Sequence, residues 1–99
     1  MENNALLEKI KTGDENAILE GLTHKGAIYR INALIYAVRN AVDSEKVKEK
    51  IYDLQNDKVS VDGYKVSDFA LAALDLLGIE KYTGINEQIK ALIESRLIF

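Results

Sequence analysis

Few residues in this chain could perform catalysis, and His24 comes first among them. A serine, cysteine or threonine nucleophile needs a base and a second group that orients the base. The sequence has one histidine and no cysteine, so a histidine-based triad would have to use His24. His24 stands in the segment Thr-His-Lys-Gly between two helical patterns, where a solvated residue at a helix start is the simpler interpretation. We therefore expect no catalytic site.

Pairs of carboxylates are the other candidates for acid–base chemistry or metal binding. Asp14 with Glu15, and Asp62 with Asp68, are candidates for either role. Helix capping and solvated surface explain these residues without a further assumption. Glycines occur singly near helix ends, so no phosphate-binding loop is present. The lack of cysteine excludes disulfides and thiolate metal sites. The sequence predicts neither a metal nor a cofactor.

A polar stripe on the predicted helix 27–42 is better suited to binding another protein. It combines the side chains of Tyr29, Asn32, Tyr36, Arg39 and Asn40. Tyrosine and arginine are enriched among the residues that dominate protein interfaces. The alternative is that both tyrosines pack against an adjacent helix and expose only their hydroxyl groups.

An acidic strip of Asp68, Ala72 and Asp75 lies on the predicted helix 66–78, and its favoured interpretation is the solvated side of an otherwise buried helix. If the two helices share a layer, Tyr36 and Arg39 would lie beside the two aspartates. The net charge of −3 argues against nucleic acid, because binding to phosphates requires a basic surface. A basic or mixed protein surface is the expected partner.

Hydrophobic spacing predicts six helices that must position these side chains. The first covers residues 3–11 after cap candidates Asn3 and Asn4, and the second begins at Asp14. The others are expected at 27–42, from Asp43 or Ser44 to residue 54, at 66–78, and from Thr83 or Asn86 onward with Ile85 in its apolar stripe. Residues 56–63 are predicted to be a loop and not a sheet, because Val59 and Val61 have no partner strand elsewhere.

Composition and length indicate one soluble domain, residues 1–99, with enough hydrophobic residues for a single core. The N-terminus carries acids where a secretory signal would be basic, and no apolar stretch approaches membrane-spanning length. A cytoplasmic location without membrane association is the expectation.

Two helix pairs of this chain resemble HEAT or armadillo-type repeats. The better copy has Asp57 in its turn and Val66-Ser67 at the start of its second helix, while Arg30 occupies the usual arginine position of the earlier copy. Ser67 in place of arginine, and the lack of an aspartate in the turn 23–26, depart from the pattern. The matching residues are Ile51, Leu54, Asp57, Val66, Ser67, Ala70, Leu74, Leu77 and Gly78, with Ile18, Leu19, Leu22, Tyr29, Arg30, Ala33, Leu34 and Ala37 in the earlier copy.

The resemblance implies an all-α fold, a right-handed α-α superhelix of stacked hairpins in which the second helices line the concave surface. Val66, Ala70, Ala73, Leu74 and Leu77 would then pack inward, and the first and last helices would cap the stack. This favours a non-catalytic protein-interaction module. Small bacterial HEAT-like proteins also resemble immunity or antitoxin-like proteins that mask a toxin, and an acidic strip would suit a basic toxin.

Two other functions remain open. Some HEAT-like folds bind DNA, so a nucleic-acid-binding or repair-related protein is one alternative, and a structural or oligomer-forming protein is the other. The apolar end Leu97-Ile98-Phe99 bears on the second, because large apolar groups need a packing partner. These residues are expected to fold back over the last core layer, and the alternative is an exposed end that self-associates.

Overall fold

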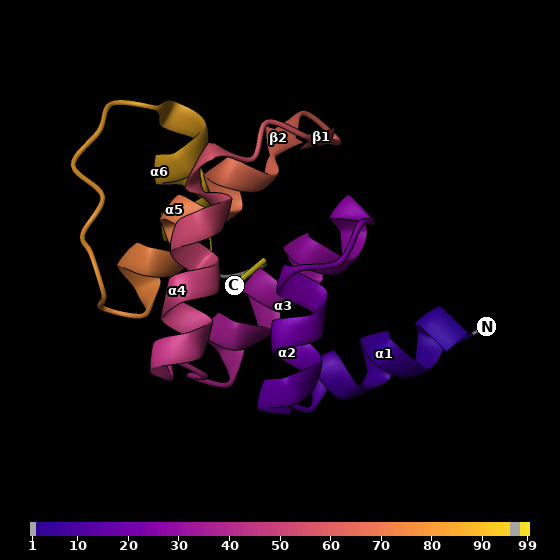
Figure 1. Cartoon of the computed structure of the whole chain (residues 1–99). Helices are drawn as coiled ribbons and strands as arrows, with labels where there is room; N and C mark the ends of the chain where they lie inside the picture. The colour runs from indigo at the N-terminus through magenta and orange to yellow at the C-terminus, as the bar shows by residue number, and fades with distance from the viewer. Residues whose placement is uncertain (1, 96–97) are drawn as a thin grey trace.

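A computed structural model describes residues 2–95 and 98–99, in which six α-helices and one short β-hairpin are present (Figure 1). The all-α class is confirmed. None of the described helices is long and apolar enough to cross a membrane. The elements are α1 Glu2–Lys11, α2 Glu15–Leu22, α3 Ala27–Arg39, α4 Glu45–Asp53, the 3₁₀ turn η1 Leu54–Asn56, β1 Ser60–Val61, β2 Tyr64–Lys65, α5 Val66–Leu76 and α6 Glu87–Glu94.

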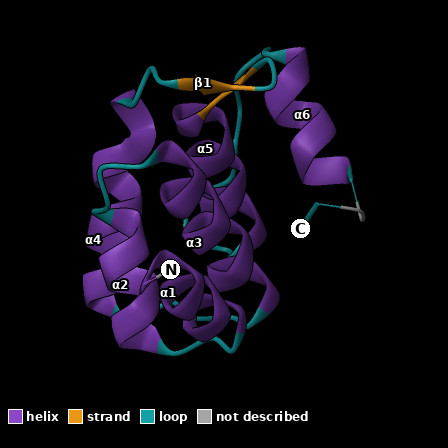
Figure 2. Ribbon diagram, turned by 90° about the vertical axis from the view of Figure 1, so that its right-hand side faces the viewer, coloured by secondary structure: helices purple, strands orange, loops and turns teal. Residues whose placement is uncertain are grey.

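The helices form two stacked pairs. α2 packs against α3 and α4 against α5, while α2 also contacts α4 and α3 contacts α5. Each member of one pair thus lies beside its counterpart in the other. Figure 2 shows α6 on the side of α5 opposite α4, and α1 adds to the other end by packing against α2 and α3. Two packed helix pairs with one further helix at each end thus make up the helical part of the fold.

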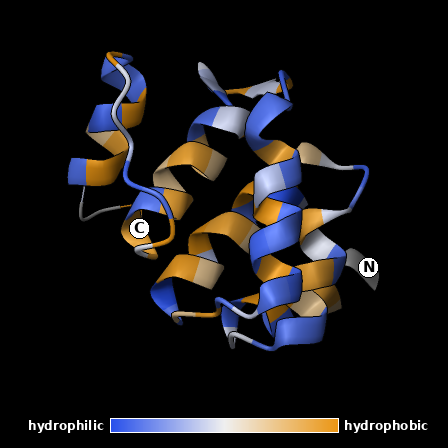
Figure 3. Ribbon diagram, turned by 60° about the vertical axis from the view of Figure 1, so that its left-hand side comes forward, coloured by the Kyte–Doolittle hydropathy of each residue, from blue (hydrophilic) through white to orange (hydrophobic). Residues whose placement is uncertain are grey.

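The core fills the space between these layers. Five residues of the predicted helix 66–78 were expected to face inward. Val66, Ala70, Ala73 and Leu74 are buried, and Leu77, which follows α5, is half-buried and packs against their cluster. Figure 3 shows hydrophobic and hydrophilic residues alternating along the helices, as amphipathic helices require. Gly21 sets the spacing in α2, because a Cβ atom there would lie 2.8 Å from Ile10 Cδ1 and 2.9 Å from Ala33 Cβ. Small residues thus permit close helix packing.

Three predicted helix caps are confirmed. The Asp14 carboxylate accepts the backbone N–H of Asn16 at 3.0 Å, and the Asn86 side chain accepts two N–H groups at the start of α6. The Ser44 hydroxyl accepts the Val47 N–H at 3.4 Å and donates to the Glu15 carboxylate at 2.7 Å. Each cap satisfies backbone donors that the first helical turn leaves without an internal partner. Ser44 also ties the start of α4 to the start of α2.

Several predicted helix limits are wrong. Asn3 and Asn4 are not caps, because α1 begins at Glu2 and includes both. Ile85 precedes the cap of α6 and is 87% exposed, so it does not join the apolar stripe. α3 ends at Arg39 and not at Val42: Ala41 adopts φ of 53°, and the Val42 N–H donates to the Ala37 carbonyl at 2.8 Å. This left-handed residue closes the helix in the manner of a helix C-cap.

The prediction that residues 56–63 form only a loop is also wrong. Ser60 pairs with Lys65 and Val61 with Tyr64 in an antiparallel hairpin. The partner strand follows at once, after Asp62 and Gly63, whose φ angles of 53° and 87° are those of a type I′ turn. An Asp-Gly pair between two short β-prone segments was therefore the signal for this hairpin. Figures 1 and 2 show it lying across one end of the α3 and α5 layer.

An ion pair connects the two helix pairs. Arg30 Nε, in the first turn of α3, lies 2.9 Å from the Asp57 Oδ2 atom, with side chains 11% and 16% exposed. The Nε–H group is not aligned for a hydrogen bond, so this contact is ionic. Arg30 Nη1 also donates to the carbonyls of His24 and Lys25 at 2.6 and 2.8 Å. Asp57 in turn accepts the Val59 N–H at 3.1 Å. One guanidinium thus fixes the turn before α3 to the segment that leads into the hairpin.

Replacing Asp57 by Asn should destabilise the fold by about 2 kcal/mol, because a mostly buried guanidinium loses its counter-charge while the shape and the acceptor for Val59 are retained. Urea unfolding monitored by circular dichroism measures this change. The matched control is Asp53→Asn in the exposed Lys50–Asp53 pair, whose atoms are 4.0 Å apart. That control should cost less than about 0.5 kcal/mol. Equal effects of both substitutions would contradict a connecting role for Arg30 and Asp57.

Candidate functional site

The two tyrosines of the predicted α3 surface are half-buried and contact other residues of the chain. The ring of Tyr29 stacks on His24 with centroids 4.2 Å apart, and Tyr36 contacts the hydrophobic core. The Arg39 guanidinium lies 5.2 Å from the centre of the Tyr36 ring. The packed alternative therefore describes Tyr36, whereas Tyr29 packs on His24 of the preceding turn.

The two asparagine side chains of the same stripe form hydrogen bonds with backbone carbonyls of α3 itself. The Asn32 side chain donates to the Ile28 carbonyl at 2.8 Å, and the Asn40 side chain donates to the Tyr36 carbonyl at 2.9 Å. Asn40 also lies against Gly13, where an added Cβ atom would be 2.7 Å from its Cγ. Both amides are thus at least partly committed to local structure. Arg39 instead reaches the end of the described chain, where it binds the carbonyl of Ile98.

The predicted acidic strip is wrong as an exposed feature. Asp68 is 5% exposed, and its carboxylate accepts the Lys65 N–H at 2.9 Å, which caps the start of α5. Ala72 is fully buried. Asp75 accepts the Tyr82 N–H at 2.8 Å and thereby anchors the α5–α6 loop that extends outward in Figure 1. α3 and α5 do pack side by side, but these aspartates stabilise local backbone and do not extend the Tyr36 and Arg39 surface.

An apolar groove runs along the α3 face next to this stripe, and sequence reasoning did not identify it. It has a volume of about 300 Å³. Its residues come from α3, the hairpin, the start of α5 and the end of the described chain, and among these described residues Asp62 is the one that carries a charge. The lining residues are Ile28, Ile31, Ile35, Val61, Asp62, Tyr64, Phe69 and Ile98.

The three isoleucines recur at spacings of three and four residues, which places them on one side of α3. Ile31 is buried, Ile35 is half-buried, and Ile28 is 48% exposed. The hairpin closes one end through Val61 and Tyr64, and the Tyr64 ring meets the edge of Phe69 at a centroid distance of 5.7 Å. The residue that could have revealed the groove in the sequence is Ile28, an apolar residue outside the buried side of α3.

Residues 98–99 border the groove and are held there by both α3 and α5. The Ile98 carbonyl accepts from Arg39 Nε at 3.1 Å and from Arg39 Nη2 at 2.7 Å. The Phe99 ring lies 6.0 Å from the Phe69 ring of α5. The expectation that this apolar end folds back is confirmed for Ile98 and Phe99, which pack against the core. Leu97 lies outside the described residues.

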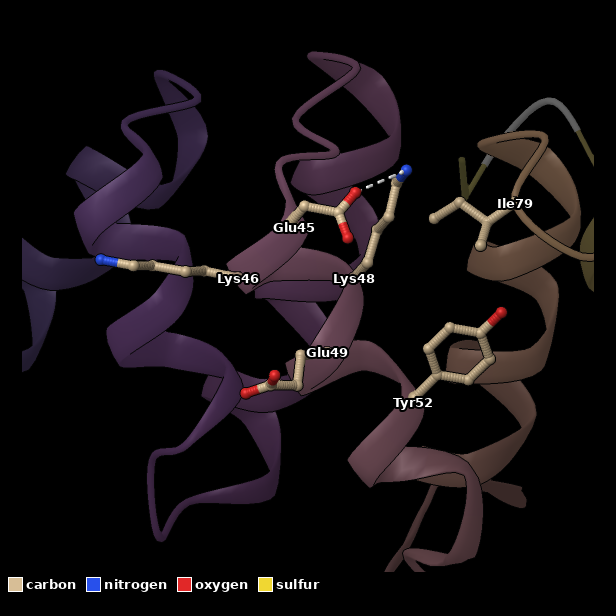
Figure 4. Close-up of a pocket in the computed structure, with 6 residues that line it drawn as sticks. All are labelled: Glu45, Lys46, Lys48, Glu49, Tyr52 and Ile79. Carbon is tan, nitrogen blue, oxygen red and sulfur yellow. Dashed lines mark hydrogen bonds and ion pairs between the residues drawn. The ribbon is translucent and has the colours of Figure 1, made fainter.

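A second depression lies between α4 and the segment that follows α5 (Figure 4). Four of the six described residues that line it are charged, and Glu45 and Lys48 form an ion pair at 3.3 Å. The Tyr52 hydroxyl donates to the Glu80 carboxylate at 3.1 Å. This hydrogen bond, together with burial and the negative charge of Glu80, raises the pKa of Tyr52 above its usual value of 10.0. A protonated phenol is therefore a hydrogen-bond donor here and is poorly suited to act as a base at neutral pH.

The Tyr52–Glu80 bond predicts a pH dependence. Because the folded-state pKa of Tyr52 is raised, its stabilising contribution is complete below pH 10 and is lost as pH rises through the folded pKa. Glu80→Gln should lower the pKa of Tyr52 toward its usual value, as measured by the ¹³C shift of the Tyr52 ring against pH. Glu49→Gln, which removes a nearby carboxylate of the same depression, should leave it unchanged. An unaltered Tyr52 titration in Glu80→Gln would show that the bond is absent in solution.

Within the described part of the chain, no group of three or more acidic, histidine or cysteine side chains is arranged to hold a metal ion. The apolar groove is the depression in which side chains from the most distant parts of the sequence converge. We take it as the candidate site. Comparison of the chain with protein-family models, curated proteins and solved structures found no match.

Proposed function

We propose that this protein is a non-catalytic protein-binding module and that the apolar groove along α3 contacts its partner. The observation that carries the proposal is the convergence of exposed or half-exposed Ile28, Ile35, Val61 and Tyr64 on one concave surface. A contiguous apolar surface on a folded domain costs free energy in water and is typical of interaction sites. Covering it with a partner removes that cost.

The lining of the groove favours a polypeptide over a small metabolite. Pockets for small molecules combine apolar walls with several convergent polar groups that fix the orientation of the ligand. Here Asp62 and the Tyr64 hydroxyl are the polar side-chain groups among the lining residues. The volume of about 300 Å³ is at the lower limit for such pockets. A shallow apolar groove with an aromatic pair at one end better suits side chains projecting from a protein.

The toxin-masking version of this function depended on an acidic strip. Since Asp68 is buried and Asp75 binds backbone, that strip is not available to attract a basic toxin. The nucleic-acid alternative requires a basic surface, whereas Asp62 is the only charged residue among the described residues that line the groove. We therefore propose the general form, a module that binds a protein through apolar contacts.

A random peptide library displayed on phage provides a direct test. Peptides selected by the wild-type protein should be rich in apolar residues and should bind Ile28→Glu at least about tenfold more weakly, which corresponds to about 1.4 kcal/mol. Because the Ile28 side chain is 48% exposed, this charge should not disturb the core. Affinities can be measured by isothermal titration calorimetry.

Val59→Glu is the matched control, since Val59 is 47% exposed and is not among the residues that line the groove. It should bind the selected peptides as the wild type does. Circular dichroism verifies that both variants remain helical. Selection of no peptide above background, or equal binding to Ile28→Glu and wild type, would refute the groove as the binding surface.

A further inference from the structure

The end of the described chain forms part of the lining of the groove, and its contacts indicate what kind of partner the groove binds. Ile98 contributes its side chain to the lining and its carbonyl oxygen to Arg39. Phe99 adds an aromatic contact with Phe69, itself a lining residue. A short segment of chain thus bridges α3 and α5 through two neighbouring apolar side chains and one backbone carbonyl.

Arg39 marks one end of the groove and the hairpin marks the other. From Ile28 to Arg39 the α-helix rises about 16 Å, at about 1.5 Å per residue. An extended chain of about five residues covers this distance. Ile98 borders the groove, and about 300 Å³ remains between it and the other lining residues. The groove therefore has room for a longer segment than the two residues described there.

The Arg39 contact discriminates between a helical and a non-helical ligand. Carbonyl groups within a helix are bonded to N–H groups of the same helix, and only those of the last turn are available to a partner. The Ile98 carbonyl accepts two hydrogen bonds from one guanidinium, and bonds from a charged donor are stronger than those between neutral groups. A non-helical segment has free backbone carbonyls along its length, so it can offer one to Arg39 while its side chains occupy the groove.

We propose that the groove binds a short non-helical peptide segment of a partner protein that carries an aliphatic side chain followed by an aromatic one, and that Ile98 and Phe99 occupy its position in the isolated chain. The inference rests on the proposed function and specifies its ligand. The partner carbonyl replaces that of Ile98 on Arg39, and the partner aromatic ring replaces Phe99 against Phe69. Because residues 98–99 are covalently attached, they compete at a high effective concentration.

The test uses a fluorescein-labelled peptide with the sequence of residues 93–99, Ile-Glu-Ser-Arg-Leu-Ile-Phe, and the full-length protein. Fluorescence anisotropy should show weak binding to the wild type and at least about tenfold tighter binding to the Ile98→Asp, Phe99→Asp double variant. Adding Ile28→Glu to the double variant should abolish the gain. A control peptide with Asp in both final positions should not bind any of these proteins.

Ile98→Ser provides a second variant in case the double substitution unfolds the chain, since it leaves Phe99 against Phe69. It should bind the labelled peptide more tightly than the wild type. Binding of the peptide to neither variant, or equally to all proteins, would overturn the inference. Tight binding of library-selected peptides that is indifferent to substitutions at Ile98 and Phe99 would also overturn it, while leaving the proposed function intact.

A second copy of the chain is the other candidate occupant of the groove, and light scattering detects it. Light scattering of the wild type at increasing concentration should give the mass of one chain, 11.1 kDa, throughout. A concentration-dependent dimer that Ile98→Ser abolishes would show that residues 98–99 exchange between copies, and it would overturn the assignment to a different partner protein.

Discussion

The contact between Arg30 and Asp57 determines how the two halves of the molecule are placed. Arg30 lies in the first turn of α3 and Asp57 lies just after α4 and η1, so the ion pair spans the boundary between the two helix pairs. Two charges removed from water in this way stabilise a structure only when their geometry and remaining hydrogen bonds are satisfied. Here the carbonyls before α3 and the N–H of Val59 provide those bonds. The main effect of the ion pair is therefore to fix the position of one helix pair relative to the other.

The Arg30–Asp57 contact also shapes the α3 surface, because it helps to place the hairpin beside α3. The segment after Asp57 continues into the hairpin, and the Asp57 carbonyl accepts the Ser67 N–H at 3.0 Å at the start of α5. The hairpin is thereby held next to α3, where Val61 contributes to the groove. α6 covers part of α5, whereas Ile28, Ile31 and Ile35 of α3 face the hairpin and Ile98. The groove follows from this unequal coverage of the two neighbouring helices.

Local rules allowed much of the fold to be predicted from the sequence. Asp14, Ser44 and Asn86 cap helices because a short polar side chain satisfies N–H groups within its own turn, a contact that needs no tertiary information. The hairpin was missed because the partner strand was sought at a distance, although Asp62 and Gly63 specify a tight turn locally. The exposure of Ile85 follows from where α6 begins, and helix limits are less certain than the existence of a helix.

The candidate site depended on tertiary contacts that spacing cannot show. Helical periodicity placed Asp68 and Asp75 outside the apolar stripe, but their carboxylates bind the N–H groups of Lys65 and Tyr82, and Asp68 is buried as a result. Tyr29 was predicted on a polar face and instead stacks on His24. Arg39 and Ile98 are far apart in sequence, so no local pattern joins them. Their contact gives Arg39 a different role, which is to bind a peptide carbonyl beside an apolar groove.

Methyl NMR of isoleucine-labelled protein tests the central claim most directly, because the groove contains several isoleucines and others lie far from it. On addition of an excess of the peptide of residues 93–99 or of a library-selected peptide, the methyl signals of Ile28, Ile35 and Ile98 should shift. Nuclear Overhauser contacts between Ile98 and α3 should weaken, while the signal of Ile79, beside the charged depression of α4, should remain constant. Shifts confined to Ile79 or Ile85, with the contacts of Ile98 unchanged, would contradict the account.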